Sequence, residues 1–131
     1  MPYIGKQSRS RLDTCHADLQ KVCEILIEHY DFSVVWGHRG EGEQNAAYAR
    51  KASKKPWPHS KHNGTPSLAV DLAPYPRLYE ADVTDFSYMA GMFMVIAAKM
   101  GVDIRWGGDF NENQRTEDGW DWGHFELTDP S

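Results

Sequence analysis

The chain has 131 residues, which is enough for one domain with a single buried core and too few for two. Hydrophobic residues make up 40% and charged residues 25%, a composition that excludes a disordered chain and a membrane-spanning class. The formal net charge of −5 argues against a nucleic-acid partner, because contacts with phosphates require a basic stripe that this sequence lacks. We therefore expect one domain over residues 1–131.

The N-terminal segment is polar and carries a small basic cluster of Lys6, Arg9 and Arg11. Such a composition predicts a solvated, flexible N-terminal arm over residues 1–11. The segment also lacks the apolar core of a secretory signal peptide, so no export signal is expected.

Apolar residues recur at three- and four-residue intervals over residues 12–30, which predicts an amphipathic helix. Cys15 and Cys23 would lie about 12 Å apart on that helix, because the rise is about 1.5 Å per residue. A disulfide requires Cα atoms within roughly 7 Å, so we expect two reduced, packed thiols.

The rest of the chain predicts short strands and two more helices. β-Branched and aromatic residues bounded by Gly, Pro or polar loops predict four strands, at 32–36, 69–73, 104–107 and 124–127. Helical spacing of apolar residues predicts helices around 46–49 and over 85–100. This order is not a regular βαβ alternation, so we expect an α+β fold with a small, mainly antiparallel sheet and about three helices.

Two histidines and two aspartates occur in two separate turn-and-strand segments. His62 stands in the turn before the strand that carries Asp71, and Asp121 precedes His124 by three residues. A catalytic zinc ion keeps three protein ligands and leaves its fourth position to water. His62, Asp71 and His124 supply that number of ligands. The spare Asp121 is then placed to accept a proton from the water as general base.

Arg39 follows the first strand, where a fixed positive charge can stabilise a developing oxyanion or hold a substrate carboxylate. Ordinary structural interpretations remain open: Asp71 could end a strand, Asp121 could cap the turn at Gly123, and Arg39 could pair with a nearby glutamate. Competing catalytic patterns are missing, because the sequence has no H-E-x-x-H, G-x-S-x-G, phosphate-binding loop or paired C-x-x-C.

Four motifs follow one another in the sequence: G-x-R…Q at 37–44, S-x-H at 60–62, A-V-D at 69–71 and D-x-x-H-F-E at 121–126. In this order they resemble the zinc D-alanyl-D-alanine carboxypeptidase (VanY-like) family, and within it the phage endolysins that are L-alanyl-D-glutamate peptidases. The resemblance covers about residues 8–128. It implies a hedgehog/DD-peptidase-like fold with zinc in a surface groove.

The resemblance also implies roles for individual residues. It implies that three residues bind zinc: His62, Asp71 and His124. It further implies that Asp121 is the general base, that Arg39 positions substrate and stabilises the transition state, and that Ser60 lies beside the metal and helps to hold substrate.

One spacing departs from the family pattern, which has six residues between the first His and the Asp, whereas residues 63–70 make eight here. The even difference keeps Asp71 on the same face of its strand, so the predicted ligand role survives. The two extra residues fall in the loop whose shape bears on substrate preference.

A second pattern, in the loop before the last strand, offers oxygen ligands that suit calcium: Asp109, Asn111, Asn113, Glu117 and Asp118. Phage relatives regulated by calcium make a regulatory calcium site one expectation. A solvated loop is the alternative.

The resemblance and the residues together predict a zinc metallopeptidase that hydrolyses the L-Ala-D-Glu bond of the peptidoglycan stem peptide, as a phage or prophage endolysin. One alternative is a D-Ala-D-Ala carboxypeptidase or dipeptidase, and another is a non-catalytic zinc-binding module. A closed structural site would need a fourth ligand, for which His59 is nearest in sequence. We expect a monomer in the host cytoplasm that acts on the cell wall after release, without membrane insertion.

Overall fold

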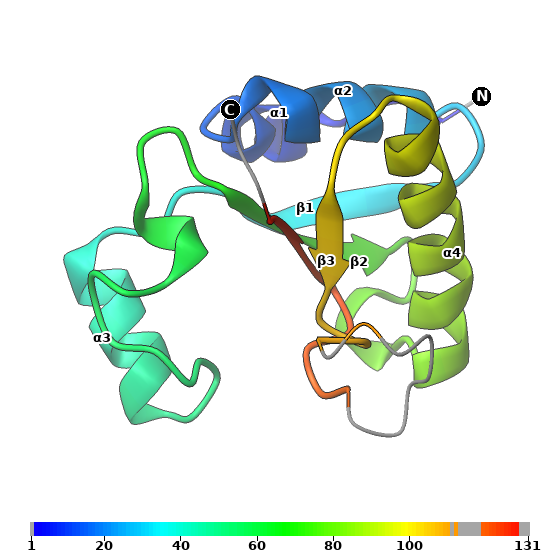
Figure 1. The fold of residues 1–131 in the computed structure, drawn as a ribbon. Helices are drawn as coiled ribbons and strands as arrows, with labels where there is room; N and C mark the ends of the chain where they lie inside the picture. Colours follow the sequence, from blue (N-terminus) through cyan, green and yellow to red (C-terminus); the bar gives the residue numbers. More distant parts are fainter. Residues whose placement is uncertain (1, 111, 113–118, 129–131) are drawn as a thin grey trace.

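The computed structural model describes residues 2–110, 112 and 119–128. Four α-helices occur in this part of the chain: α1 (Lys6–Leu12), α2 (Ala17–Leu26), α3 (Glu41–Ala49) and α4 (Val83–Lys99). Four strands accompany them: β1 (Phe32–Trp36), β2 (Ala69–Pro74), β3 (Ile104–Trp106) and β4 (His124–Leu127). Two short 3-10 helices complete the described elements: η1 (Lys61–Asn63) and η2 (Leu78–Glu80). The predicted α+β fold is confirmed (Figure 1).

The four strands form one sheet in the order β1-β2-β4-β3, and every neighbouring pair is antiparallel. In the register of β2 and β4, Asp71 lies opposite His124. On the other side of β2, Asp71 lies opposite Trp36, beyond an irregularity in β1 after Val34. The sheet register therefore brings together residues that are far apart in the sequence.

The apolar core lies between the sheet and the helices α2 and α4, which contact each other. Leu19 and Leu26 of α2 and Phe93 of α4 are fully buried in it. The Phe93 ring stacks on that of Phe125 in β4, with ring centroids 4.0 Å apart. Burying one such side chain stabilises the fold by about 1.5–3 kcal/mol, so these contacts hold β4 firmly in the sheet. Helix α3 stands apart from this layer (Figure 1).

The expected N-terminal arm over residues 1–11 is wrong from Lys6 onward, because this segment forms α1 and packs on β1. Leu12 is fully buried, and the backbone N–H of Val34 donates to Ser8 Oγ at 2.9 Å. Arg11 Nη1 donates to the Val34 carbonyl at 2.9 Å. Ser8 and Arg11 thus satisfy the backbone N–H and carbonyl of Val34 on the outer side of β1, which is an edge strand of the sheet.

The continuous helix expected over residues 12–30 is also interrupted. Cys15 forms a parallel bridge with Ser67, and α2 begins at Ala17, where His16 Nδ1 accepts from the backbone N–H of Asp18 at 3.1 Å. Tertiary pairing and a local cap therefore override the helical periodicity. Neither cysteine forms a disulfide, as predicted. Burial raises the pKa of the Cys15 thiol to about 12.

None of the described helices is both long and apolar enough to span a lipid bilayer. The 17-residue α4, the longest of them, carries its buried side chains against the sheet.

Candidate active site

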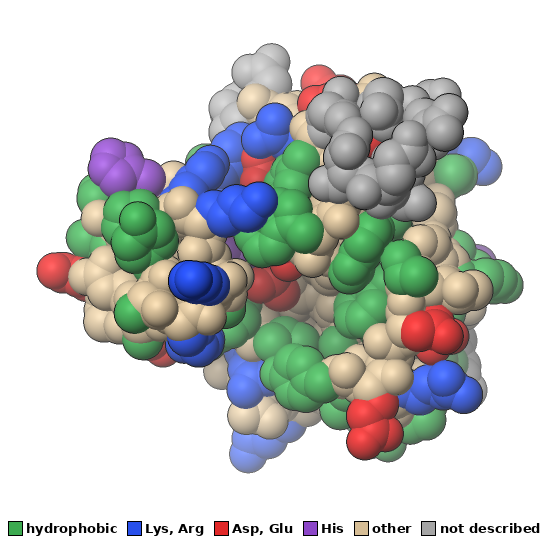
Figure 2. All heavy atoms as spheres, turned by 90° about the horizontal axis from the view of Figure 1, so that it is seen from below, with side chains coloured by type: hydrophobic (Ala, Val, Ile, Leu, Met, Phe, Trp, Pro, Cys, Tyr) green, Lys and Arg blue, Asp and Glu red, His purple; other side chains and the backbone are tan. Residues whose placement is uncertain are grey.

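A cleft of about 240 Å³ lies where the open side of the sheet faces the α3 segment, which we define as residues 40–61. Figure 2 shows acidic side chains deep in this hollow and Lys and Arg side chains around it. The lining comes from η1, the sheet strands and segments on either side of them, and it includes all six site residues predicted from the sequence: Arg39, Ser60, His62, Asp71, Asp121 and His124.

His62 enters the cleft from η1 and is 2% exposed. Ser60 precedes it as the helix cap, and its hydroxyl oxygen accepts from the His62 backbone N–H at 3.2 Å. The ring atom Nδ1 lies 2.8 Å from the Gly37 carbonyl, so Nε2 is directed at Asp71 Oδ1, 3.1 Å away. Gly37 is required there, because a Cβ atom would lie 2.3 Å from the Arg11 carbonyl oxygen.

Asp71 and His124 face each other across the pairing of β2 with β4. His124 Nδ1 lies 3.0 Å from Asp71 Oδ1, and the two histidine rings meet edge to face with centroids 5.1 Å apart. One ligand atom from each of His62, Asp71 and His124 lies within 4.8 Å of the other two. These three residues could therefore hold a metal ion.

Glu126 fixes the orientation of His124, a role that we did not infer from the sequence although Glu126 stands in the last motif. Its Oε1 lies 2.8 Å from His124 Nε2, and its Oε2 accepts from Arg105 Nη2 at 2.7 Å. With Nε2 bound to Glu126, only Nδ1 of His124 remains for the metal position. Residues two apart on a strand share a face, and this spacing is the signal that could have identified Glu126.

The electrostatics of the three residues suit a cation. Burial by itself would raise the pKa of Asp71, but the charge and hydrogen bonds of His62 and His124 outweigh it and hold the pKa well below its usual range. Burial would lower the pKa of His124, whereas its hydrogen bonds to Asp71 and Glu126 raise that pKa to about 10. The carboxylates of Asp71 and Glu126 thus stabilise a positive charge at this group.

Asp121 lies beside this group, with its Oδ2 3.8 Å from His124 Nδ1 and a side chain that is 31% exposed. Burial, followed by the negative charge of Asp71, raises the pKa of Asp121 to about 6. A carboxylate with a pKa near neutrality, placed at the edge of a metal site, has the position and the basicity of a general base.

Arg39 is nearly buried in the wall of the cleft, with 8% of its side chain exposed. Its Nη2 lies 3.5 Å from Asp71 Oδ2, and its guanidinium lies over the Trp36 ring, 4.7 Å from the centroid. The sequence alternative, a pairing with a nearby glutamate, does not occur in the described ion pairs, in which Arg39 pairs with Asp71.

Gln44 connects Arg39 to the α3 segment and is fully buried. Its Oε1 accepts from Arg39 Nη1 at 3.1 Å and from Asn63 Nδ2 at 3.1 Å. Its Nε2 donates to Ser53 Oγ at 2.9 Å and to the Lys55 carbonyl at 2.5 Å. The G-x-R…Q motif contains Gln44, yet only the folded chain shows that this amide spans the cleft wall.

Two other predictions concern residues near the site. His59 is exposed and does not belong to the ligand group of three, so the described residues give no support to a closed structural site. Of the proposed calcium ligands, only Asp109 falls within the described residues. The others lie outside them: Asn111, Asn113, Glu117 and Asp118.

Replacing Gly107 with Ala is expected to displace Asp121 and to lower kcat/KM by about a hundredfold, since displacements near 1 Å have costs of that order. A Cβ atom at Gly107 would lie 1.9 Å from the Asp121 carbonyl oxygen. The Gly107 backbone also donates to the His124 carbonyl at 2.7 Å, so the whole turn would move. Gly91→Ala, in open space on α4, is the control for folding and should keep full activity. Wild-type kinetics in Gly107→Ala would show that this turn does not place Asp121.

Comparison with known proteins finds a similar solved structure and a matching family model. The crystal structure of Serratia marcescens L-Ala D-Glu endopeptidase ChiX superposes with a TM-score of 0.73 at 23% sequence identity, covering 94% of this chain and 87% of that one. This likeness establishes the shared fold. The comparison with curated protein sequences gives no match. The family model described as phage L-alanyl-D-glutamate peptidase matches residues 2–128. The chain therefore belongs to the phage L-alanyl-D-glutamate peptidase family.

Proposed function

We propose that this protein is a zinc metallopeptidase that hydrolyses the L-Ala-D-Glu bond of the peptidoglycan stem peptide, as a phage or prophage endolysin. The observation that carries the proposal is the group of three ligand atoms within 4.8 Å of one another, with Asp121 beside it in a cleft. Membership of the peptidase family supports the bond and the wall polymer as substrate.

Zinc fits the donor set best. Two imidazole nitrogens and one carboxylate oxygen, from His62, His124 and Asp71, are ligands that zinc prefers, and three protein ligands leave a position open for catalysis. The backbone of Gly37 and the carboxylate of Glu126 hold the outer nitrogens of the two histidines, as metal-binding histidines require. When bound, zinc would polarise the scissile carbonyl and lower the pKa of water.

The residues of the cleft divide the remaining chemistry between them. Asp121 takes a proton from the attacking water and passes it to the leaving amine, a step in which general acid–base catalysis contributes about 10²–10⁴-fold. Arg39, whose guanidinium faces the same space, stabilises the negative charge that develops on the carbonyl oxygen. Ser60 lines the cleft beside His62 and helps to hold the substrate.

Two alternatives remain testable against this proposal. A D-Ala-D-Ala carboxypeptidase or dipeptidase would use the same ligands, but the family match favours the L-Ala-D-Glu bond. A non-catalytic zinc-binding module would not need Asp121 with a raised pKa beside the ligand group and Arg39 buried in the same cleft.

Digestion of purified peptidoglycan tests the proposal. We expect new amino groups on D-Glu, identified by labelling the released termini, and complete loss of digestion after chelation, restored by added zinc. Release of D-Ala alone would establish the carboxypeptidase instead. Binding to the wall without any new amino group would identify a binding module.

A further inference from the structure

The cleft has an excess of positive charge although the chain as a whole carries −5. Five cationic residues line it: Arg39, Lys54, Lys55, Lys61 and Arg105. Three acidic residues line it as well, and all contact the metal-ligand group or its support: Asp71, Asp121 and Glu126. Arg39 pairs with Asp71, and Lys61 and Arg105 pair with Glu126, so Lys54 and Lys55 supply the surplus charge at the cleft (Figure 2).

Two guanidinium groups in the cleft wall have a buried N–H without an acceptor. Arg39 Nε and Arg105 Nε are buried and find no hydrogen-bond partner among the described residues. The remaining nitrogens are partly engaged, since Arg39 Nη1 donates to Gln44 and Arg105 Nη2 donates to Glu126. Each guanidinium has five N–H donors, and the described contacts use only part of them, so the two arginines that line the cleft keep donors for a ligand with acceptor oxygens.

Gln44 holds the lysine-bearing part of the α3 segment at a fixed place relative to Arg39. The same buried amide accepts from Arg39 and donates to the backbone carbonyl of Lys55. The Lys55 N–H in turn donates to Ser53 Oγ at 3.2 Å. Gln44 therefore fixes the backbone position of Lys55 and the position of the Arg39 guanidinium through one amide group.

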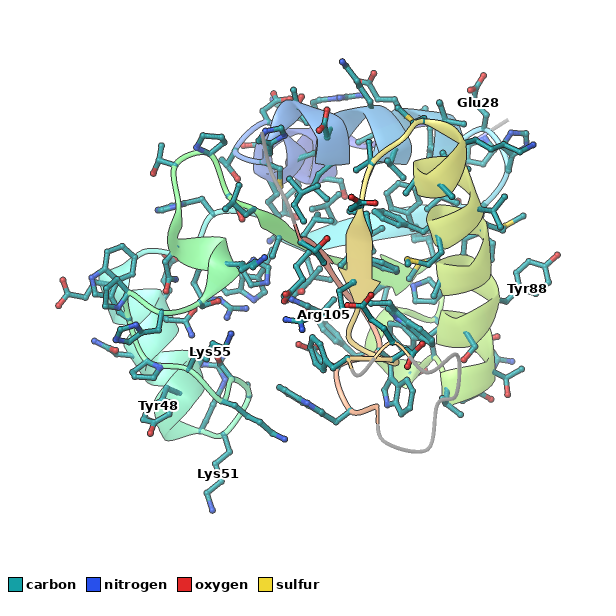
Figure 3. All side chains as sticks on the ribbon, viewed as in Figure 1. Glu28, Tyr48, Lys51, Lys55, Tyr88 and Arg105 are labelled. Carbon is teal, nitrogen blue, oxygen red and sulfur yellow. The ribbon has the colours of Figure 1, made fainter. Side chains whose placement is uncertain are left out.

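The direction of the side chains separates two lysines of this segment. Figure 3 shows Lys55 on the side of the α3 segment that faces the sheet, with Arg105 opposite, whereas Lys51 points away from the molecule. Lys55 and Arg105 line the cleft, and Lys51 does not. The pair Lys55 and Lys51 thus offers a matched comparison, because both are exposed lysines and lie four residues apart in the loop after α3.

We infer that the cleft selects stem peptides in which the glutamate after the scissile bond keeps a free carboxylate, over peptides in which that group is amidated. This inference rests on the proposed function. A glutamate linked through its side chain leaves its α-carboxylate free beside the scissile bond. A carboxylate offers two acceptor oxygens and a negative charge to guanidinium and ammonium groups, whereas an amide offers one oxygen and no charge.

Two synthetic peptides, identical except for a free or an amidated α-carboxyl on γ-linked D-Glu, test the inference with the zinc-loaded protein. We expect wild-type kcat/KM to favour the acid by about tenfold or more, as hydrogen bonds to charged groups imply. Lys55→Gln should reduce this acid-to-amide ratio by about fivefold. In the wild type, this ratio should also fall as ionic strength rises, because salt screens the attraction between the carboxylate and the cationic side chains. A variant effect that is only structural would not depend on salt in this way.

Lys51→Gln is the control, and it should leave the ratio and both absolute values as in the wild type. Equal cleavage of the two peptides by the wild type would overturn the inference while leaving the peptidase proposal intact. A parallel loss on both peptides in Lys55→Gln would also overturn it. Cleavage of neither peptide would instead overturn the proposed function.

Discussion

Asp71→Ala is expected to abolish metal binding and to lower kcat/KM by more than about a hundredfold. Loss of a residue that only supports a metal ligand already costs about 10–100-fold, and Asp71 is itself a proposed ligand. Asp71 Oδ1 lies 3.1 Å from His62 Nε2 and 3.0 Å from His124 Nδ1, so its carboxylate stands between the other two donors. Without it, two imidazole donors and the nearby charge of Arg39 would face the metal position. A divalent cation would then be held weakly.

Metal content per chain, measured after removal of loosely bound ions, checks this expectation alongside the kinetics. Asp103→Ala is the matched control, because Asp103 is exposed and does not line the cleft. Circular dichroism should show that Asp71→Ala keeps its secondary structure, since the Asp71 side chain lines the cleft and does not belong to the apolar core. A variant with full zinc content and full activity would refute the assignment of this ligand.

Asp121→Asn is expected to retain metal and to lose about 10²–10⁴-fold in kcat, the contribution typical of a general base. Asparagine has the size of aspartate but does not accept a proton. Asp121 lies outside the group of three ligands, with its Oδ2 3.8 Å from His124 Nδ1. The variant therefore separates catalysis from metal binding.

The two measurements must be made on the same preparation. Zinc content and wall binding should match the wild type, while the release of D-Glu amino termini falls. Asp103→Asn, at an exposed aspartate that does not line the cleft, controls for a general effect of charge removal. If Asp121→Asn loses zinc together with activity, Asp121 is a ligand. Unchanged activity with zinc retained would favour the non-catalytic module.

Local patterns in the sequence were sufficient for most elements of the fold. The strands around Val34, Val70 and Phe125, and the long helix through Phe93, follow from β-branched and apolar residues whose spacing acts over a few neighbours. The helix α1 did not follow from them, because its burial depends on contacts of Ser8 and Leu12 with β1. Ser8 and its partner Val34 lie far apart in the sequence, so no local pattern predicts their contact.

The sequence by itself determined which residue types could form the site, since four ordered motifs contain His62, Asp71, Asp121 and His124. Only the tertiary structure decided that they meet, because the antiparallel register of β2 with β4 places Asp71 opposite His124. It alone showed that Glu126 orients His124 and that Gln44 ties Arg39 to the α3 segment. The physical reason is that hydrogen bonds between distant side chains depend on packing, which no local periodicity encodes.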